Sequence, residues 1–156
     1  MPTLKTFDYA FMVRAPLAKV AAFHHDARAL KRLTPPPIFV KLHCVEPLTE
    51  GSAADFTLWF GPVPVRWQAV HSDVDQLHGF TDLQRSGPMK WWKHIHRFGA
   101  IGAQSTQVTD QIEYAHHSGW RGLLSRVLFN SLALRLLFFY RGVVTRAALE
   151  KENVAR

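Results

Sequence analysis

Residues 78–114 read HGFTDLQRSGPMKWWKHIHRFGAIGAQSTQVTDQIEY. Three runs in this segment alternate in polarity along the chain, and turn-like breaks at 85–88 and 99–102 separate them. This pattern predicts three antiparallel strands joined by hairpins. Successive side chains of a strand point to opposite faces of the sheet, so every second residue of each run shares one face.

Polar and apolar side chains mix on that shared face. Its polar members are Asp82, Gln84, His94, His96, Asp110 and Tyr114, and its large apolar members are Phe80, Trp92, Phe98, Val108 and Ile112. Dry cores rarely hold so many polar groups, and solvated surfaces rarely hold so many aromatic ones. The face therefore predicts the lining of an interior cavity. The expected register places Asp82 near Trp92 and His94 near Asp110, and a one-residue slip would exchange the two faces.

The remaining chain supplies four more strands and a few helices. Residues 4–13 alternate as a strand, and residues 16–33 predict two short helices, because proline suits a first helical turn. Residues 38–75 predict three strands, and pairing around the GPVP turn puts Trp67 on the apolar inner face. After Gly119, leucines and aromatic residues recur at helical spacing and predict one long C-terminal helix.

These elements predict one α+β domain that spans residues 1–156. Seven strands form a curved antiparallel sheet around the long C-terminal helix, with two short helices between the first and second strands. One helix cannot fill the concave side of such a sheet. A cavity that accepts an apolar ligand is therefore expected between the sheet and the helix.

The bulk composition narrows the class of protein. The formal charge of +7 suits an anionic partner, but the basic residues are scattered and no nucleic-acid-binding motif occurs, so no nucleic acid is expected. The single cysteine, Cys44, favours a reducing compartment, and residues 1–13 lack the continuous apolar core of a targeting signal. We therefore expect a cytoplasmic protein.

The central pattern resembles the SRPBCC superfamily, which includes START lipid-binding domains, the birch-pollen allergen fold and polyketide cyclases. The matching segments are LTPPP (33–37), VRW (65–67), GFTDLQRSGPMKWWKHIHRF (79–98), VTDQIEY (108–114) and FFYR (138–141). The resemblance covers nearly the whole chain and is closest to small bacterial ligand-binding members. It implies a helix-grip fold whose cavity holds a hydrophobic or aromatic small molecule, lipid-like or polyketide-like. It does not imply one activity, because members of the superfamily differ in function.

Eleven side chains are candidates for contact with such a ligand. The apolar candidates are Trp67, Phe80, Trp92, Phe98 and Ile112, and the polar candidates, which would orient a polar group, are Asp82, Gln84, His94, His96, Asp110 and Tyr114.

Three roles are open for the polar candidates. They could pair with one another and fix the sheet register, because an unpaired buried polar group costs about 1–3 kcal/mol. They could recognise a ligand or carry acid–base chemistry, with His94 and Asp110 as the catalytic pair of a cyclase or dehydratase. A His-x-His pair with one carboxylate is also a known metal-ligand set, but nothing else in the sequence reinforces it. No metal and no cofactor are expected.

Two further expectations concern the surface. The histidines at 24–25 and 116–117 lie at element ends, where we expect them to be solvated. Arginines of the last helix could meet anionic head groups while its apolar residues reach inward, so peripheral contact with an anionic membrane remains an alternative. The sequence leaves the oligomeric state and the ligand's identity open.

Overall fold

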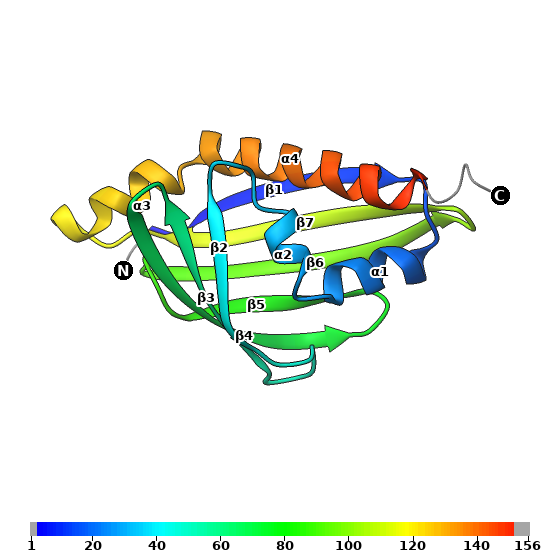
Figure 1. Cartoon of the computed structure of the whole chain (residues 1–156), viewed down its shortest axis with the longest axis horizontal. Helices are drawn as coiled ribbons and strands as arrows, with labels where there is room; N and C mark the ends of the chain where they lie inside the picture. The colour runs from blue at the N-terminus through cyan, green and yellow to red at the C-terminus, as the bar shows by residue number, and fades with distance from the viewer. Residues whose placement is uncertain (1–2, 152–156) are drawn as a thin grey trace.

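The computed structural model describes residues 3–151, which form one sheet and five helical segments (Figure 1). The strands are β1 (Lys5–Val13), β2 (Phe39–Val45), β3 (Ala53–Phe60), β4 (Val63–Asp75), β5 (Gly79–Ser86), β6 (Trp91–Gly102) and β7 (Ser105–Ala115). The helices are α1 (Leu17–His25), α2 (Ala29–Arg32), the 3₁₀ turn η1 (Gly119–Gly122), α3 (Leu123–Leu128) and α4 (Ser131–Leu149).

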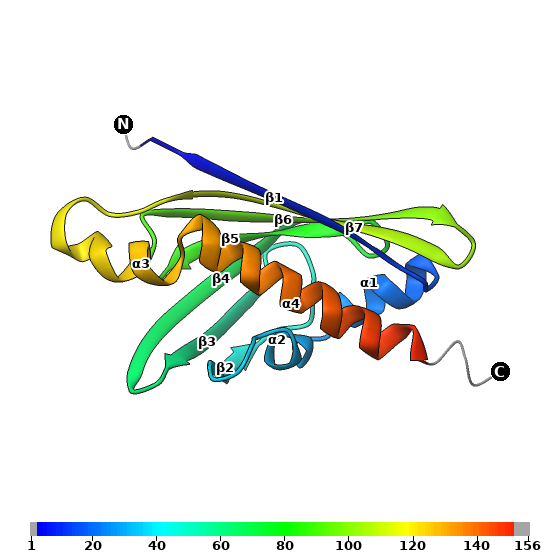
Figure 2. The same ribbon diagram turned by 90° about the horizontal axis from the view of Figure 1, so that it is seen from above.

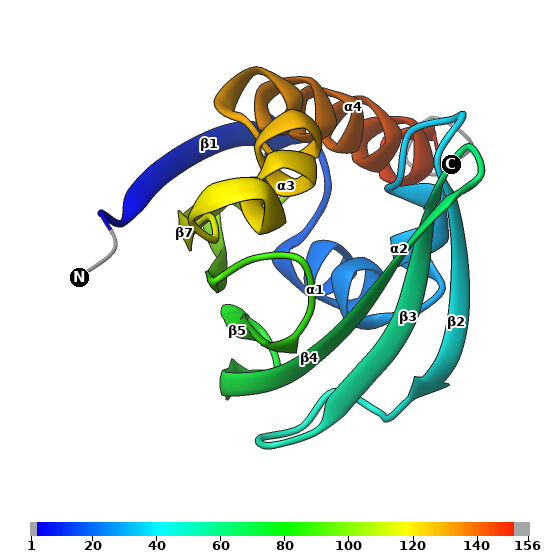
Figure 3. The same ribbon diagram turned by 90° about the vertical axis from the view of Figure 1, so that its left-hand side faces the viewer.

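The seven strands form one antiparallel sheet in the order β1-β7-β6-β5-β4-β3-β2. The segment with α1 and α2 carries the chain from β1 at one edge of the sheet to β2 at the other. Register irregularities interrupt β2, β4 and β6, and bulges of this kind bend a strand and increase its twist. Figure 3 shows the resulting curl, in which α4 lies between the two edges of the sheet.

The concave face of the sheet is apolar because alternate residues point inward. In β1 these residues are Phe7, Phe11 and Val13, all buried. Helix α4 crosses the opening of the sheet (Figure 2) and packs on β1 close to Gly142, where a Cβ atom would lie 3.4 Å from the Phe11 ring. The α+β helix-grip architecture expected from the sequence is confirmed.

The C-terminal helical region differs from the single long helix that the sequence predicts. It begins with the η1 turn, continues as α3, and is interrupted at Phe129 and Asn130 before α4. The Asn130 side chain accepts a hydrogen bond from the backbone N–H of Ala133, at 2.9 Å, and so caps α4. Asparagine is a preferred N-cap residue, so the break has a local cause. It allows Phe129 to turn inward against Trp67 and Trp92.

The register of β5, β6 and β7 also differs from the expected one, by two residues. Asp82 lies opposite His94 rather than Trp92, and His94 lies opposite Ile112. Asp110 lies opposite His96. A shift of two residues keeps every side chain on its own face, because the side-chain period of a strand is two. The residues that point inward are therefore the expected ones, but each lies opposite a different residue of the neighbouring strand than expected.

Candidate functional site

A cavity of about 520 Å³ lies between the concave sheet, α4 and the α2 region. Its walls are mostly aromatic and aliphatic. Strand residues of the wall include Phe11, Phe56, Phe60, Trp67, Phe80 and Trp92, and helix and loop residues include Leu30, Leu33, Ile38, Phe129, Leu134, Leu137 and Phe138. Charged and titratable residues of the lining are His24, Asp26, Asp82, His94, His96, Asp110 and Arg141. The cavity is therefore an apolar chamber with one strongly polar region.

Seven of the eleven candidate residues line this cavity. They are Trp67, Phe80, Asp82, Trp92, His94, His96 and Asp110. Strands β4, β5, β6 and β7 each supply at least one of them, because the inward faces of these strands are adjacent in the sheet. Contact of these residues with a ligand stays a prediction.

The other four candidates point inward but do not line the cavity. Gln84 instead hydrogen-bonds both backbone groups of Met89, at 2.8 and 3.2 Å, and so braces the β5–β6 turn. Phe98 and Ile112 are buried in the core, where Phe98 packs on His24 with ring centroids 4.9 Å apart. Tyr114 packs between Trp92 and His116. The alternation of side chains along a strand predicts which face of the sheet a residue lies on. It does not predict whether an inward residue lines the cavity or lies in the packed core.

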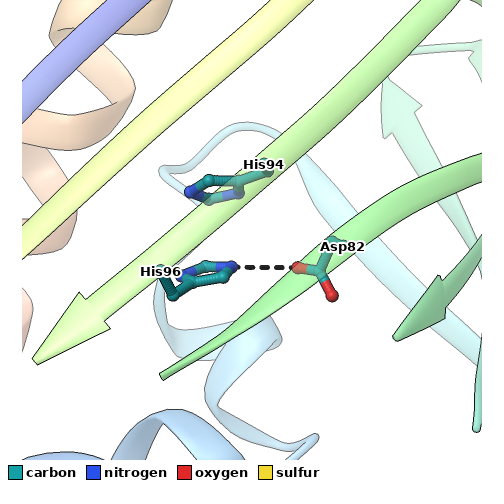
Figure 4. Close-up of side chains that lie close together, drawn as sticks. All are labelled: Asp82, His94 and His96. Carbon is teal, nitrogen blue, oxygen red and sulfur yellow. Dashed lines mark hydrogen bonds and ion pairs between the residues drawn. The ribbon is translucent and has the colours of Figure 1, made fainter. Parts of the chain in front are cut away.

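The polar region is a continuous run of side chains, which we call the His–Asp chain: His71, Asp82, His96, Asp110 and His94. His94 Nε2 lies 2.8 Å from Asp110 Oδ1, and His96 Nδ1 lies 3.1 Å from the same oxygen. His96 Nε2 lies 2.9 Å from Asp82 Oδ2 (Figure 4). The second oxygen of Asp82 lies 3.2 Å from His71 Nε2. His71 in turn contacts Ser52 through Nδ1, 2.9 Å from the hydroxyl oxygen.

Two carboxylates therefore hold one imidazole between them. Burial opposes a charge on His96, but Asp110 and Asp82 outweigh it and raise the pKa of His96 to about 9. Burial and the neighbouring His96 charge lower the pKa of His94 to about 4 despite its bond to Asp110. The ring centroids of His94 and His96 lie 3.7 Å apart, so the charge on His96 strongly opposes protonation of His94. Near neutral pH the geometry thus places a cation on His96 and leaves His94 neutral.

The carboxylates of the His–Asp chain are ionised. Burial alone would raise the pKa of Asp110, but hydrogen bonds from His94 and His96 lower it well below its usual range. Burial likewise opposes the charge of Asp82, and His96 lowers its pKa. Asp82 is the most accessible member of the chain, since its side chain is 25% exposed while those of His94, His96 and Asp110 are almost fully buried. Within the His–Asp chain, Asp82 is therefore the side chain with the most exposed surface, while its Oδ1 atom is itself buried and its Oδ2 atom is bonded to His96.

Sequence reasoning missed three charged or titratable residues of the lining: His24, Asp26 and Arg141. His24 was expected to be solvated, but it is partly buried in the lining, donates from Nδ1 to Val20 O at 2.9 Å, and has a pKa lowered to about 4 by burial. Arg141 lines the cavity from α4, with its guanidinium 5.0 Å from the Phe138 ring centroid and 3.3 Å from the Leu33 carbonyl. His24 lies on α1 and Arg141 on α4, so the packing of these helices places them at the cavity. Alternation along the strands gives no information about residues of the helices.

Three side chains of the site could hold a metal ion. Asp82, His94 and His96 each offer one ligand atom, and these atoms all lie within 4.8 Å of one another. A pair of histidines and a carboxylate is a familiar set for divalent transition metals. These side chains are already hydrogen-bonded within the His–Asp chain, and a cation would have to displace the proton that two carboxylates hold on His96. Hydrogen bonds engage His94 Nε2, His96 Nε2 and Asp82 Oδ2, whereas His96 Nδ1 and Asp82 Oδ1 have only ion-pair neighbours at 3.1 and 3.2 Å.

Comparison with known proteins identifies the fold. No family model matches the sequence, and no curated protein matches it either. Among solved structures, the ZhuI aromatase/cyclase from Streptomyces sp. R1128 superposes with a TM-score of 0.75 at 14% identity, covering 99% of this chain and 97% of that chain. Protein CV1439 from Chromobacterium violaceum gives 0.74 at 12% identity, with coverages of 94% and 98%. Norcoclaurine synthase from Thalictrum flavum, in complex with dopamine and hydroxybenzaldehyde, gives 0.69 at 17% identity, with coverages of 96% and 88%. The chain therefore has the same helix-grip fold as these proteins.

Proposed function

We propose that this protein binds a small, hydrophobic and aromatic molecule whose polar end carries a hydrogen-bond donor. The observation that carries the proposal is the His–Asp chain, which lies in the wall of a cavity whose remaining lining is mostly apolar. The volume of about 520 Å³ falls within the range of about 300–1,000 Å³ that is usual for small-molecule sites. The aromatic walls favour a flat ring system, since stacked and edge-to-face contacts add to the burial of apolar surface.

Asp82 determines the kind of polar group that suits this cavity. An ionised carboxylate accepts hydrogen bonds and donates none, so its partner on the ligand must be a hydroxyl or another donor. Hydrogen bonds to charged groups contribute about 1.5–3 kcal/mol, which makes this contact a source of selectivity. Structures with the same fold support this class, because the norcoclaurine synthase complex holds two hydroxylated aromatic molecules, dopamine and hydroxybenzaldehyde.

The test is a binding screen with a matched chemical control. The folded protein is titrated with phenols of one to four fused rings and with their O-methyl ethers, and binding is followed by native mass spectrometry and calorimetry. We expect at least one phenol to bind about tenfold more tightly than its ether, equivalent to about 1.4 kcal/mol. Absence of binding by every compound, or equal affinity for phenols and ethers, would contradict the proposal.

A substitution in α4 tests the location of the binding site. Ala133 lines the cavity, so Ala133→Phe should fill part of its volume and weaken binding. Ala147 lies on the exposed side of the same helix, and Ala147→Phe should leave the affinity unchanged. A loss of binding in both variants, or in neither, would place the ligand elsewhere.

A second candidate function is acid–base catalysis, such as a cyclisation or dehydration, and the His94–Asp110 pair favours it. If the Nε2–H of neutral His94 donates to Asp110, its Nδ1 keeps a lone pair and can accept a proton. This candidate predicts that His94→Gln abolishes turnover of a bound substrate while binding persists. A variant that binds and turns over normally would remove the catalytic role and leave the binding function in place.

A further inference from the structure

The outer face of α3 and α4 is exposed and apolar. Trp120 in the preceding η1 turn is 84% exposed, and η1, α3 and α4 together expose eight large apolar side chains: Trp120, Leu123, Leu124, Val127, Leu132, Leu136, Phe139 and Val143. On α4 they recur every three or four residues, which places them in one stripe along the helix. Soluble proteins rarely leave so long a stripe in contact with water, so the stripe indicates a docking surface.

The charges around this stripe are of one sign. No aspartate or glutamate occurs between Glu113 and Glu150, whereas four exposed arginines, at 121, 126, 135 and 146, lie in the same interval, and Arg141 lines the cavity. Arg135 is exposed and adjoins Leu132 and Phe139 at helical spacings of three and four residues. Arg146 adjoins Val143 at a spacing of three residues. Such an apolar stripe with a cationic border has the composition of a helix that lies in the interface of an anionic bilayer.

A second copy of the chain is a poorer partner for this surface. In a two-fold dimer the same patch would face itself, and its arginines would oppose arginines with no acidic residue on that helix face to pair with them. A bilayer with acidic lipids supplies both an apolar layer and negative charge. By length and composition the segment Gly119–Leu149 could even cross a membrane, yet α4 buries Leu134, Phe138 and Thr145 inside the protein. Surface docking is therefore the arrangement compatible with the fold.

We propose that α3 and α4 dock this protein on anionic membrane surfaces, with the apolar stripe inserted among the lipids and the arginines at the head groups. Leu136 belongs to the stripe, is 61% exposed and also lines the cavity, so the cavity reaches the surface beside the docking face. Docking would therefore place this opening at the bilayer, where apolar molecules accumulate. The proposal does not depend on the identity of a ligand, because the docking residues other than Leu136 do not line the cavity.

The test is co-sedimentation of the full chain with vesicles of phosphatidylcholine alone and of phosphatidylcholine mixed with phosphatidylglycerol. We expect binding to the mixed vesicles to be at least about tenfold tighter and to weaken as salt is raised, because screening reduces attraction between exposed charges. The double variant Leu132→Gln with Phe139→Gln should lose at least about tenfold in affinity for the mixed vesicles. Glutamine is a good helix former, so the unfolding temperature should remain near that of the parent protein.

A matched control replaces two exposed apolar residues in the hairpins at the other end of the sheet, Leu77→Gln with Ile101→Gln. This control should bind the mixed vesicles as the parent protein does. Equal losses in both double variants, or no preference for the anionic vesicles, would overturn the proposal. A second result would also overturn it: the parent protein is a dimer that fails to bind vesicles, and the Leu132→Gln, Phe139→Gln variant is a monomer while the control variant remains a dimer.

Discussion

The side chains of His94 and Asp110 meet diagonally across two strands. Their backbones are not paired, since His94 lies opposite Ile112 and Asp110 lies opposite His96, yet His94 Nε2 and Asp110 Oδ1 are 2.8 Å apart. The diagonal reach lets Asp110 contact both imidazoles with one oxygen. Asp110 therefore links the two imidazoles of His94 and His96 through a single oxygen atom.

Removal of the Asp110 carboxylate should destabilise the protein severely. In Asp110→Ala the buried His96 keeps Asp82 but loses its second anion, and His94 loses its acceptor. Breaking a buried charged pair in this way costs about 3–5 kcal/mol. Denaturant unfolding at pH 7 measures the loss. The matched control is Asp55→Ala, which removes a carboxylate paired with Arg66 on the exposed side of the sheet and should have a far smaller effect. Similar losses in the two variants would contradict a buried network.

The two central histidines should titrate far apart. His96 is expected to keep its proton up to a pKa of about 9, whereas His94 is expected to stay neutral down to a pKa of about 4. Nitrogen-15 NMR of labelled histidine side chains measures both values directly. If both rings titrated near 6.5, the network would be open to solvent and not organised as the distances indicate.

The stability of the protein should therefore pass through a maximum in pH. The pKa of His96 is raised, so its stabilising contribution is complete below about pH 6.5 and is lost as the pH rises through about 9. The pKa values of His24 and His94 are lowered, so their contribution is complete above about pH 6.5 and is lost as the pH falls through about 4. Thermal unfolding across this range should give the highest melting temperature near pH 6.5. A melting temperature that rises steadily from pH 6.5 to 9 would be inconsistent with a charged His96.

Alternation along β5, β6 and β7 was sufficient to predict the inward face of the sheet, and with it most of the polar lining. It failed on details that depend on the connections between strands. The turns at 85–90 and 103–104 set the register two residues away from the expected one, and the sequence offers many turn geometries for such segments. The break at Asn130 was foreseeable, since the Asn-Ser pair there is a good cap, but the apolar run on both sides favoured a continuous helix.

Whether an inward residue reaches the cavity could not be predicted from strand alternation. Phe98 shares its face with His96, yet α1 covers it through His24, and only the packing of that helix excludes Phe98 from the cavity. For the same reason, His24 and Arg141 gave no pattern of their own, because each reaches the cavity from a helix packed against the sheet. Tertiary packing decides these positions, and strand periodicity carries no information about it.

Two adjacent phenylalanines on α4 provide a test of how this helix is oriented. Phe138 is 1% exposed and packs on Phe7, Tyr9 and His94, whereas Phe139 is 59% exposed. Phe138→Ala should cost about 3–5 kcal/mol of unfolding free energy and enlarge the cavity. Phe139→Ala should change the unfolding free energy by no more than about 0.5 kcal/mol. The reverse order of effects would show that α4 is rotated about its axis relative to the structure.

A hydrogen-bond donor of the bound ligand should contact the His–Asp chain. The most direct measurement is nitrogen-15 NMR of the histidine side chains while the tightest phenol from the binding screen is titrated in. The His94 and His96 resonances should shift as the site fills, while those of His43, which bonds Thr57 on the outer face of the sheet, and of exposed His78 should not. Saturable binding that leaves His94 and His96 unchanged would contradict the central claim.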